Sequence, residues 1–192
     1  MADRIDVRIA ELADASAFAA IYGPIVAETA ISFETEPPSA AVMGERLAKT
    51  LTTHPWLTAV RGGEIVGYAY AGAHRERAAY RWSCDVTVYV APEGHRSGVG
   101  TALYGTLLPL LRRQGLRSAF GGIAMPNAGS VALHEAMGFT PIGVYRDVGF
   151  KLGAWRDVGW WRLGLSADEG QPADPLTFPQ ISAEPGFRLT DG

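Results

Sequence analysis

The segment that most constrains this chain runs from Val86 to Gly115 and reads VTVYVAPEGHRSGVGTALYGTLLPLLRRQG. A β-rich run ends in a turn, and a loop with Gly94, Gly98 and Gly100 leads into an apolar-periodic helix that ends at Gly115. Glycines let backbone N–H groups approach a ligand without interference from a Cβ atom, and a helix N-terminus carries partial positive charge. The pattern predicts a site for a phosphate or pyrophosphate.

Spacing excludes two common phosphate-binding loops. A P-loop needs a Lys-Ser or Lys-Thr pair after its last glycine, and none follows Gly100. A dinucleotide fingerprint needs GxGxxG, and the stretch from Gly98 to Leu103 lacks the third glycine. Taken alone, the loop is also compatible with a plain glycine-rich turn between a strand and a helix.

Composition limits the class of protein. The chain has 192 residues, 47% of them hydrophobic, which is enough for one packed domain. A net charge of -3 without a basic run argues against nucleic acid as a partner. One cysteine provides no zinc pattern, and no apolar stretch approaches the ~20 residues of a membrane span. Since the N-terminal stretch also lacks an apolar signal region, we expect a soluble cytoplasmic protein without a metal.

The order of predicted elements indicates a mixed α/β sheet flanked by helices. Asp14 and Ser39 are expected to cap helices that end near residues 27 and 51. Strands are predicted at 5–9, 56–61, 64–71, 80–90, 118–124, 140–147 and 157–165, and later helices at about 99–114 and 127–137.

The chain is expected to divide into a domain at 1–165 and a proline-rich tail at 166–192. Prolines interrupt any periodicity in the tail, which is typical of a solvated segment. Its apolar residues offer an alternative, because they would let the tail pack on a subunit surface. These residues are Leu176, Phe178, Ile181 and Phe187.

Two motifs carry a resemblance to a known family. The loop HRSGVG resembles the acyl-CoA loop of GNAT-type N-acetyltransferases, and PNAGSVALHEAMGF (126–139) resembles their second CoA motif. The segments AISFETEPPS, GYAYAGAHRERAAYRWSCDVTVYV and GFKLGAWRDVGWWRL are similar to phosphinothricin N-acetyltransferases. The resemblance spans about residues 5–165. It implies a GNAT fold, acetyl-CoA as donor, a small-molecule amine as acceptor and a homodimer.

The resemblance also implies which residues hold the donor. The loop and helix start would bind acetyl-CoA together with Asn127 and Ser130, while the backbone at the end of the preceding strand would polarise the thioester carbonyl. The first loop position is His95 where the family usually has Gln or Arg, which leaves the role of its side chain open. The donor residues are Val88, Tyr89, Val90, His95, Arg96, Ser97, Gly98, Val99, Gly100, Thr101, Asn127 and Ser130.

Asp85 is the candidate general base. Alternation along the strand places Asp85 with Thr87 and Tyr89 on one face and Cys84 on the other. A carboxylate in mid-strand is unusual, and the family has an acidic residue here, usually Glu, as its proposed base. Asp is one methylene shorter, so a water between carboxylate and amine is expected. The alternative is a structural carboxylate. Cys84 is expected in the core and not as a nucleophile.

His134 is the second catalytic candidate. It shares a helix face with Asn127 and Ser130. Many GNAT enzymes have a Tyr here that acts as an acid toward the CoA sulfur, whereas the phosphinothricin subfamily has a His that is proposed to move a proton. A histidine that is merely hydrogen-bonded is the alternative.

The acceptor pocket is predicted from Phe33, Arg75, Arg77 and Tyr80. Arg77, Tyr80 and Phe33 match family positions that contact an acidic amino-acid substrate, and guanidinium groups suit carboxylate or phosphinate. The alternative for Arg75 and Arg77 is a solvated loop. The resemblance implies acetylation of the α-amine of phosphinothricin, methionine sulfoximine or methionine sulfone by direct transfer.

Two other functions stay open on the sequence. One is a GNAT enzyme for another amine, such as a protein N-terminus, a polyamine or an aminoglycoside; Arg75 and Arg77 argue against a cationic substrate. The other is a non-catalytic acyl-CoA-binding module, against which the presence of Asp85 and His134 argues.

Overall fold

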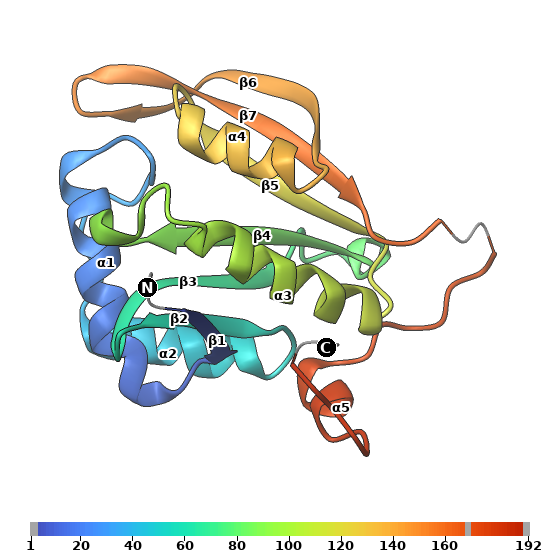
Figure 1. Cartoon of the computed structure of the whole chain (residues 1–192). Helices are drawn as coiled ribbons and strands as arrows, with labels where there is room; N and C mark the ends of the chain where they lie inside the picture. The colour runs from blue at the N-terminus through green and yellow to red at the C-terminus, as the bar shows by residue number, and fades with distance from the viewer. Residues whose placement is uncertain (1–3, 168–169, 190–192) are drawn as a thin grey trace.

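The computed structural model describes residues 4–167 and 170–189, and seven strands within them form one sheet in the order β1-β2-β3-β4-β5-β7-β6 (Figure 1). Within the described chain, β4 and β5 are the one parallel pair of neighbours. The strands are β1 (Ile5–Ile9), β2 (Trp56–Arg61), β3 (Glu64–Ala73), β4 (Ser83–Val90), β5 (Ser118–Ala124), β6 (Thr140–Lys151) and β7 (Ala154–Gly164). The predicted mixed sheet with flanking helices is confirmed.

Helices cover both faces of the sheet. α3 (Val99–Arg113) packs on β1 to β4 and α4 (Ala128–Ala136) on β5, while α1 (Ala15–Glu28) and α2 (Ala40–Leu51) cover the other face. Alternation along each strand therefore produces two apolar cores. One is built around α3, and the other, around α1 and α2, is rich in aromatic side chains. Within the described residues, no helix is long and apolar enough to span a membrane.

Most helix and strand ends agree with the predictions, and their caps explain why. The Ser39 hydroxyl accepts a hydrogen bond from the backbone N–H of Val42, as predicted, and so begins α2. Strand β4 starts three residues later than predicted, because Ala78–Tyr80 form a 3₁₀ turn. β6 and β7 are longer than predicted and form one long hairpin.

The predicted cap at Asp14 is wrong. No side-chain hydrogen bond from Asp14 caps α1. Its buried carboxylate instead accepts two hydrogen bonds from the Arg8 guanidinium at 2.7 Å and others from the Glu11 backbone and the Thr58 hydroxyl. The Asp14 carboxylate binds Arg8 of the neighbouring strand β1 and does not cap α1, because the bidentate charged pair satisfies both oxygens.

The solvated tail expected from composition is also wrong for much of residues 170–189. The short helix α5 (Phe178–Ser182) buries Phe178 and Ile181 in the core beside α3. The Gln114 side-chain amide at the end of α3 donates to the carbonyl of Leu176 at 2.7 Å. Figure 1 shows α5 below the C-terminal end of α3. The segment therefore packs on its own domain and supports that end of the helix.

Candidate active site

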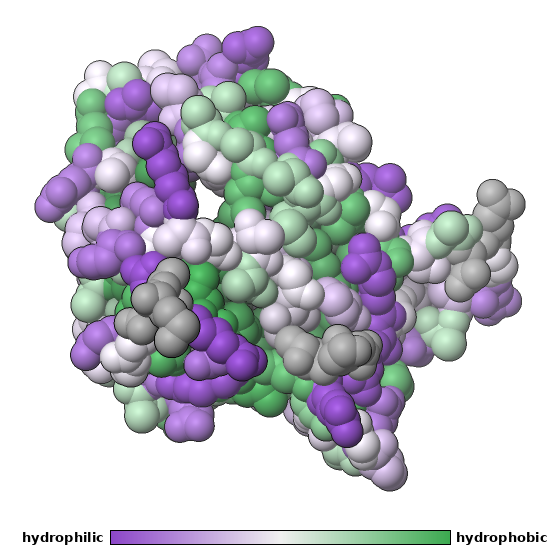
Figure 2. Space-filling model, viewed as in Figure 1, coloured by the Kyte–Doolittle hydropathy of each residue, from purple (hydrophilic) through white to green (hydrophobic). Residues whose placement is uncertain are grey.

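The sheet opens between its two parallel strands. Register pairs Ser83 with Ser118 and Asp85 with Phe120, and there the pairing ends. β4 continues to Val90 and β5 to Ala124, and the two strands diverge (Figure 1). The space-filling view shows an opening in the surface between α4 and the loop that leads into α3 (Figure 2). Asp85 thus lies at the base of a V-shaped gap, where backbone groups have no partner strand.

The three loop glycines have different structural roles. At Gly94 a Cβ atom would lie 2.7 Å from Val90, and at Gly100 it would lie 2.7 Å from Leu133 of α4, so both glycines permit close packing. Gly98 has a φ of 86° and open space on its Cβ side. Gly98 is therefore the glycine that keeps the start of α3 accessible to a ligand. The sequence pattern predicts this role for all three glycines.

The start of α3 presents unsatisfied donors. The first helical hydrogen bond there runs from Ala102 to the carbonyl of Gly98, so the N–H groups of Val99, Gly100 and Thr101 have no helical acceptor. Arg96, with a φ of 56°, and Gly98 both adopt left-handed conformations around Ser97. Such a turn directs successive N–H groups into one concavity, which suits the pyrophosphate of a CoA thioester.

Hydrogen bonds from outside the loop hold it in place. Arg61, at the end of β2, donates to the Ser97 hydroxyl at 2.9 Å and to the Glu93 carbonyl at 2.7 Å. The His95 ring nitrogen Nε2 lies 3.0 Å from the carbonyl oxygen of Val90. Because a carbonyl only accepts, Nε2–H is the donor, and the His95 side chain ties the loop to the last residue of β4.

Alternation indicates which groups of β4 face the gap. The backbone N–H of Ala91 donates to the carbonyl oxygen of Val66 in β3, and β3 pairs with β4 in antiparallel register throughout. Odd-numbered residues of β4 therefore point their N–H groups toward β3, and those of Val88 and Val90 point toward the gap. The predicted backbone contribution of Tyr89 does not fit this arrangement, since its N–H belongs to the β3 ladder.

Asp85 forms a close pair with His74. Its Oδ1 lies 2.6 Å from the Nδ1 of His74, which stands one residue beyond β3. The carboxylate is about one third exposed and the imidazole 13%. Burial raises the pKa of the Asp85 carboxyl group, and the His74 hydrogen bond partly opposes that shift. The carboxylate predicted as a base is therefore already engaged by a second titratable group.

Aromatic side chains from several strands surround His74. Its ring stacks on Phe120 of β5 at a centroid distance of 4.4 Å, and Tyr80 and Trp160 meet its edge at 6.0 Å. The Arg75 guanidinium lies 5.8 Å from the centre of the Trp160 ring. Two predicted pocket residues therefore lie near Asp85 through His74: Tyr80 contacts the His74 ring, and Arg75 lies over Trp160, which also contacts that ring.

His134 lies on the opposite face of the sheet from Asp85. Its ring covers the backbone of Gly121, the residue after Phe120, where a Cβ atom would lie 2.6 Å away. Nδ1 donates to the Ser130 carbonyl at 2.8 Å, so Nε2 accepts from the buried Tyr104 hydroxyl at 3.1 Å. Burial lowers the pKa of His134 and so favours the neutral ring, while the hydrogen bond to Ser130 partly opposes this shift. To protonate a leaving sulfur, His134 must first release Tyr104.

Asn127 and Cys84 have structural roles in the fold. The Asn127 side chain accepts from the backbone N–H of Ser130 at 3.1 Å and caps α4. Cys84 is fully buried on the α3 side, and burial raises the pKa of its thiol to about 12, which excludes it as a nucleophile. Within the described residues, no three His, Cys, Asp or Glu side chains gather to bind a metal.

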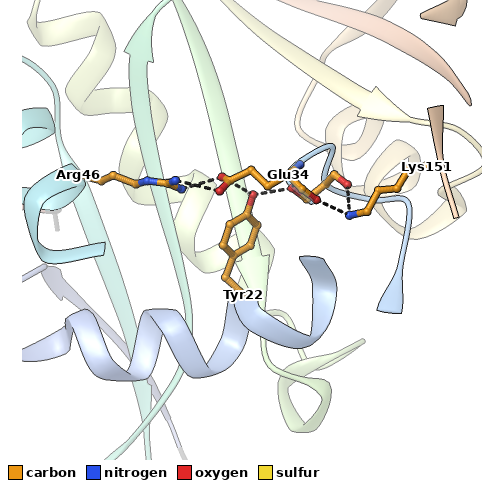
Figure 3. Close-up of polar contacts among 5 residues, drawn as sticks. Tyr22, Glu34, Arg46 and Lys151 are labelled. Atoms are coloured by element: carbon orange, nitrogen blue, oxygen red, sulfur yellow. Dashed lines mark hydrogen bonds and ion pairs between the residues drawn. The ribbon is translucent and has the colours of Figure 1, made fainter. Parts of the chain in front are cut away.

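Glu34 organises the loop between α1 and α2. Its carboxylate accepts from both Arg46 terminal nitrogens at 2.7 and 2.9 Å and from the Tyr22 hydroxyl at 2.9 Å (Figure 3). The Tyr22 hydroxyl also lies 2.6 Å from that of Ser32. Burial, with the Glu34 charge, raises the pKa of Tyr22 to about 12. The loop is therefore bonded to both helices that it connects.

Lys151 joins this loop to the hairpin of β6 and β7. Its Nζ donates to the carbonyl oxygen of Val26 at 2.7 Å. It also donates to the carbonyl oxygens of Ser32 and Glu34 at 2.6 and 2.7 Å (Figure 3). The residue is 8% exposed, and burial lowers the pKa of its ammonium while the Glu34 charge opposes the shift. Three carbonyl dipoles compensate the buried charge, so the lysine determines where the loop lies.

Phe33 and Arg77, the other predicted pocket residues, lie apart from the His74 cluster. Phe33 packs on β6, where a Cβ atom on Gly149 would lie 2.3 Å from its ring. Arg77 is exposed before the 3₁₀ turn. Among the described residues, no hydrogen bond or ring contact joins either side chain to His74 or Asp85. A cavity of about 500 Å³, lined among others by Tyr70, Gly72 and Tyr89, lies on the same face.

Sequence patterns did not single out His74, Phe120 or Lys151 as site residues. His74 continues the alternation of Tyr68, Tyr70 and Gly72, so its face was open to prediction, but its pairing with Asp85 depends on the β3–β4 register. Lys151 is bonded to residues more than 100 positions earlier in the chain. No local periodicity reports such a contact.

A parallel strand pair that opens at a carboxylate, beside a glycine-led helix start, defines an acyl-CoA-dependent transferase. A family model described as an acetyltransferase (GNAT) domain matches residues 7–160. The chain belongs to the GNAT acetyltransferase family. The predicted family, fold and enzyme class are confirmed.

The chain is similar to acetyltransferases named for particular amino-acid substrates. The chain is 38% identical over 174 residues to a phosphinothricin N-acetyltransferase of Streptomyces viridochromogenes, covering 90% of this chain and 95% of that protein. It is 32% identical over 163 residues to an L-methionine sulfoximine/L-methionine sulfone acetyltransferase of Salmonella typhimurium, covering 83% and 94%. A solved phosphinothricin acetyltransferase from Sinorhizobium meliloti, in complex with acetyl-CoA, has 32% identity and a TM-score of 0.85, covering 88% of this chain and 94% of that one.

Proposed function

We propose that the protein acetylates the α-amine of an amino acid whose side chain ends in a tetrahedral phosphorus or sulfur centre. Phosphinothricin, methionine sulfoximine and methionine sulfone are the acceptors in question, and acetyl-CoA is the donor. The observation that carries the proposal is the position of Asp85 at the base of the gap between β4 and β5, on the strand whose far end leads into the donor loop. The names of the similar proteins support the substrate class.

Direct transfer requires a bound thioester, a neutral amine and a stabilised oxyanion. The N–H groups at the start of α3 would hold the pyrophosphate, with Gly98 keeping the approach open, and those of Val88 and Val90 would polarise the thioester carbonyl. Asp85 provides the negative charge that favours removal of a proton from the ammonium form of the acceptor. His134 flanks the gap from the α4 side, where the sulfur would leave.

The acceptor is proposed to bind on the face that α1 and α2 cover. Arg75 and Tyr80 would form one side, and the exposed Arg77, just before the 3₁₀ turn that carries Tyr80, would turn toward the acceptor and contact the phosphinate or sulfone oxygens through its planar donor fork. Phe33 forms the other side, supported by β6 and held by the loop that Lys151 fixes. Glutamate should be a poorer acceptor, because a planar carboxylate leaves polar pocket groups unpaired, a penalty of up to ~10⁴–10⁵ in a hydrogen-bonding site.

A homodimer in the cytoplasm completes the proposal. β6 forms one edge of the sheet and exposes Tyr145, Val148 and Phe150, while Trp155 of β7 is 62% exposed. Apolar side chains gathered along a sheet edge favour a protein partner, and a second copy of the chain is the simplest one. Size-exclusion chromatography with light scattering tests this directly, since a monomer at micromolar concentration would contradict it. Neither a nucleic acid nor a membrane partner is proposed.

The test of the substrate is a CoA-release assay with a panel of amines. Phosphinothricin, methionine sulfoximine and methionine sulfone should be acetylated, glutamate weakly, and spermidine and a short peptide not at all. Arg77→Ala should raise the KM for the amino acid and leave the KM for acetyl-CoA unchanged. Acetylation of spermidine or the peptide alone would overturn the substrate class. Absence of turnover with every amine, while acetyl-CoA still binds, would favour a binding module.

A further inference from the structure

We propose that His74 is the group that takes the proton from the acceptor amine, and that Asp85 orients the His74 ring and stabilises its protonated form. This deepens the proposed function and rests on it, because it concerns the proton that an amine must lose before acetylation. Three observations carry it: the hydrogen bond between the two side chains, the unoccupied second ring nitrogen, and the position of the ring over the gap.

The hydrogen bond defines the tautomer of His74. An ionised carboxylate only accepts, so the 2.6 Å contact to Asp85 Oδ1 requires a proton on Nδ1. The neutral ring then carries its lone pair on Nε2. This is the arrangement in which a carboxylate orients an imidazole and stabilises the imidazolium that forms when the ring accepts a proton.

The second ring nitrogen is available. Among the described residues none bonds to Nε2 of His74, and that atom is not among the buried polar atoms that lack a partner. A nitrogen that is neither bonded nor buried is within reach of water or of a substrate. The contrast with His134 is direct, because both nitrogens of that ring are occupied within the fold.

The ring stands where an acceptor must approach. His74 extends from β3, contacts Asp85 on β4 and stacks on Phe120 of β5, so the imidazole lies over the point where the strands part. Tyr80 and Trp160 border its edge. The imidazole therefore contacts Asp85 on β4 and Phe120 on β5, and we infer that the amine reaches its open nitrogen from the gap between these strands.

The proton balance follows from this arrangement. Nε2 accepts one proton from the ammonium group and becomes imidazolium, whose charge Asp85 compensates. The neutral amine nitrogen forms a bond to the thioester carbonyl carbon, the carbon–sulfur bond breaks, and the second proton leaves the nitrogen for the CoA sulfur. His74 then returns its proton to solvent through the same open nitrogen. The products are the N-acetyl amino acid, free CoA and one proton.

The test uses two substitutions that separate the ring nitrogens. In His74→Asn the side-chain amide occupies the place of Nδ1 and still donates to Asp85, but no base remains at the place of Nε2. We expect kcat/KM for the amine to fall by about 10²–10⁴, the range of a lost general base, with the KM for acetyl-CoA unchanged. Asp85→Asn should have a similar effect, and the double variant should be no worse than either single one.

A second measurement, chemical rescue, distinguishes loss of the base from poor folding of a variant. Free imidazole added to His74→Ala should restore part of the activity, and the same imidazole should leave Asp85→Asn unaffected. His74→Asn within a few-fold of wild type, or His74→Ala without rescue, would overturn the proposal and return the base function to Asp85. The assay uses whichever amine the wild-type enzyme acetylates, so failure of the proposed substrate is seen separately, in the wild type.

Discussion

The donor side and the acceptor side of this sheet are built in different ways. On the donor side, the loop before α3 presents backbone N–H groups, and its conformation depends mainly on Gly98 and on neighbours close in sequence, with Arg61 of β2 as a distant support. On the acceptor side, the geometry depends on side chains from distant segments, such as Lys151 bonded to Ser32 and His74 bonded to Asp85. A site made of backbone groups tolerates changes of side chain, whereas one made of side-chain contacts loses its shape when one partner is replaced.

The largest expected effect concerns the support of α3 at its far end. A chain that ends at Ser166 loses the buried side chains of Phe178 and Ile181, each contributing about 1.5–3 kcal/mol, and the Leu176 carbonyl that Gln114 binds. We expect the free energy of unfolding in urea to fall by about 3–6 kcal/mol.

The full-length double variant Phe178→Ala/Ile181→Ala serves as the comparison for that truncation. It should account for most of the loss, because it removes the buried side chains and keeps the chain. An unchanged urea midpoint after truncation would show that the donor side needs no distant support, and so would sharpen the contrast between the two sides.

Lys151→Met tests whether distant side chains shape the acceptor side. The substitution leaves three carbonyls without their donor, so the free energy of unfolding should fall by about 1.5–3 kcal/mol. The KM for the amine should rise more than the KM for acetyl-CoA, because the freed loop carries Phe33. Arg112→Met, which removes an exposed cation on α3, is the matched control. Equal rises in both KM values would contradict the division into two sides.

Gly98→Val tests whether the donor site depends on backbone conformation. Valine at a φ of 86° is strained by about 1–3 kcal/mol, and its side chain would occupy the open space at the start of α3. We expect the KM for acetyl-CoA to rise about tenfold, or about 1.4 kcal/mol. Gly63→Val, at a φ of 85° in the distant β2–β3 turn, carries the same strain and should leave that KM unchanged. The same rise in both variants would show a general loss of stability.

The smallest effect is a pH dependence of stability at Asp85. Because burial raises the pKa of the Asp85 carboxyl group in the fold, the folded protein binds more protons than the unfolded chain between the unfolded pKa, near 4, and the raised value. Stability should therefore fall as pH rises through this window. Asp85→Asn should remove that part of the slope in urea unfolding series at pH 4 to 7. An identical slope would mean that the carboxylate titrates as if exposed.

Features that depend on local sequence were predicted correctly, whereas contacts between distant segments were not. The limits of α2, α3 and β5 and the capping role of Ser39 agree with the sequence patterns, because periodicity and caps are local. Asp14 is an exception, because it was predicted to cap α1 and does not. Its local pattern favoured a cap, but Arg8 and Thr58 from neighbouring strands provide stronger partners. Where a polar group has both local and distant partners, local pattern is insufficient.

The sequence by itself determined the family, the donor loop and the face on which Asp85 lies, since these depend on motif spacing and on the two-residue period of a strand. Only the tertiary structure decided the partners of the two histidines. Each histidine follows an apolar residue and precedes a charged one, yet His134 is enclosed by Tyr104 and Ser130, while His74 pairs with Asp85 and keeps one nitrogen open. The physical reason is that hydrogen-bond partners depend on strand register and helix packing, which bring together residues that no local pattern relates.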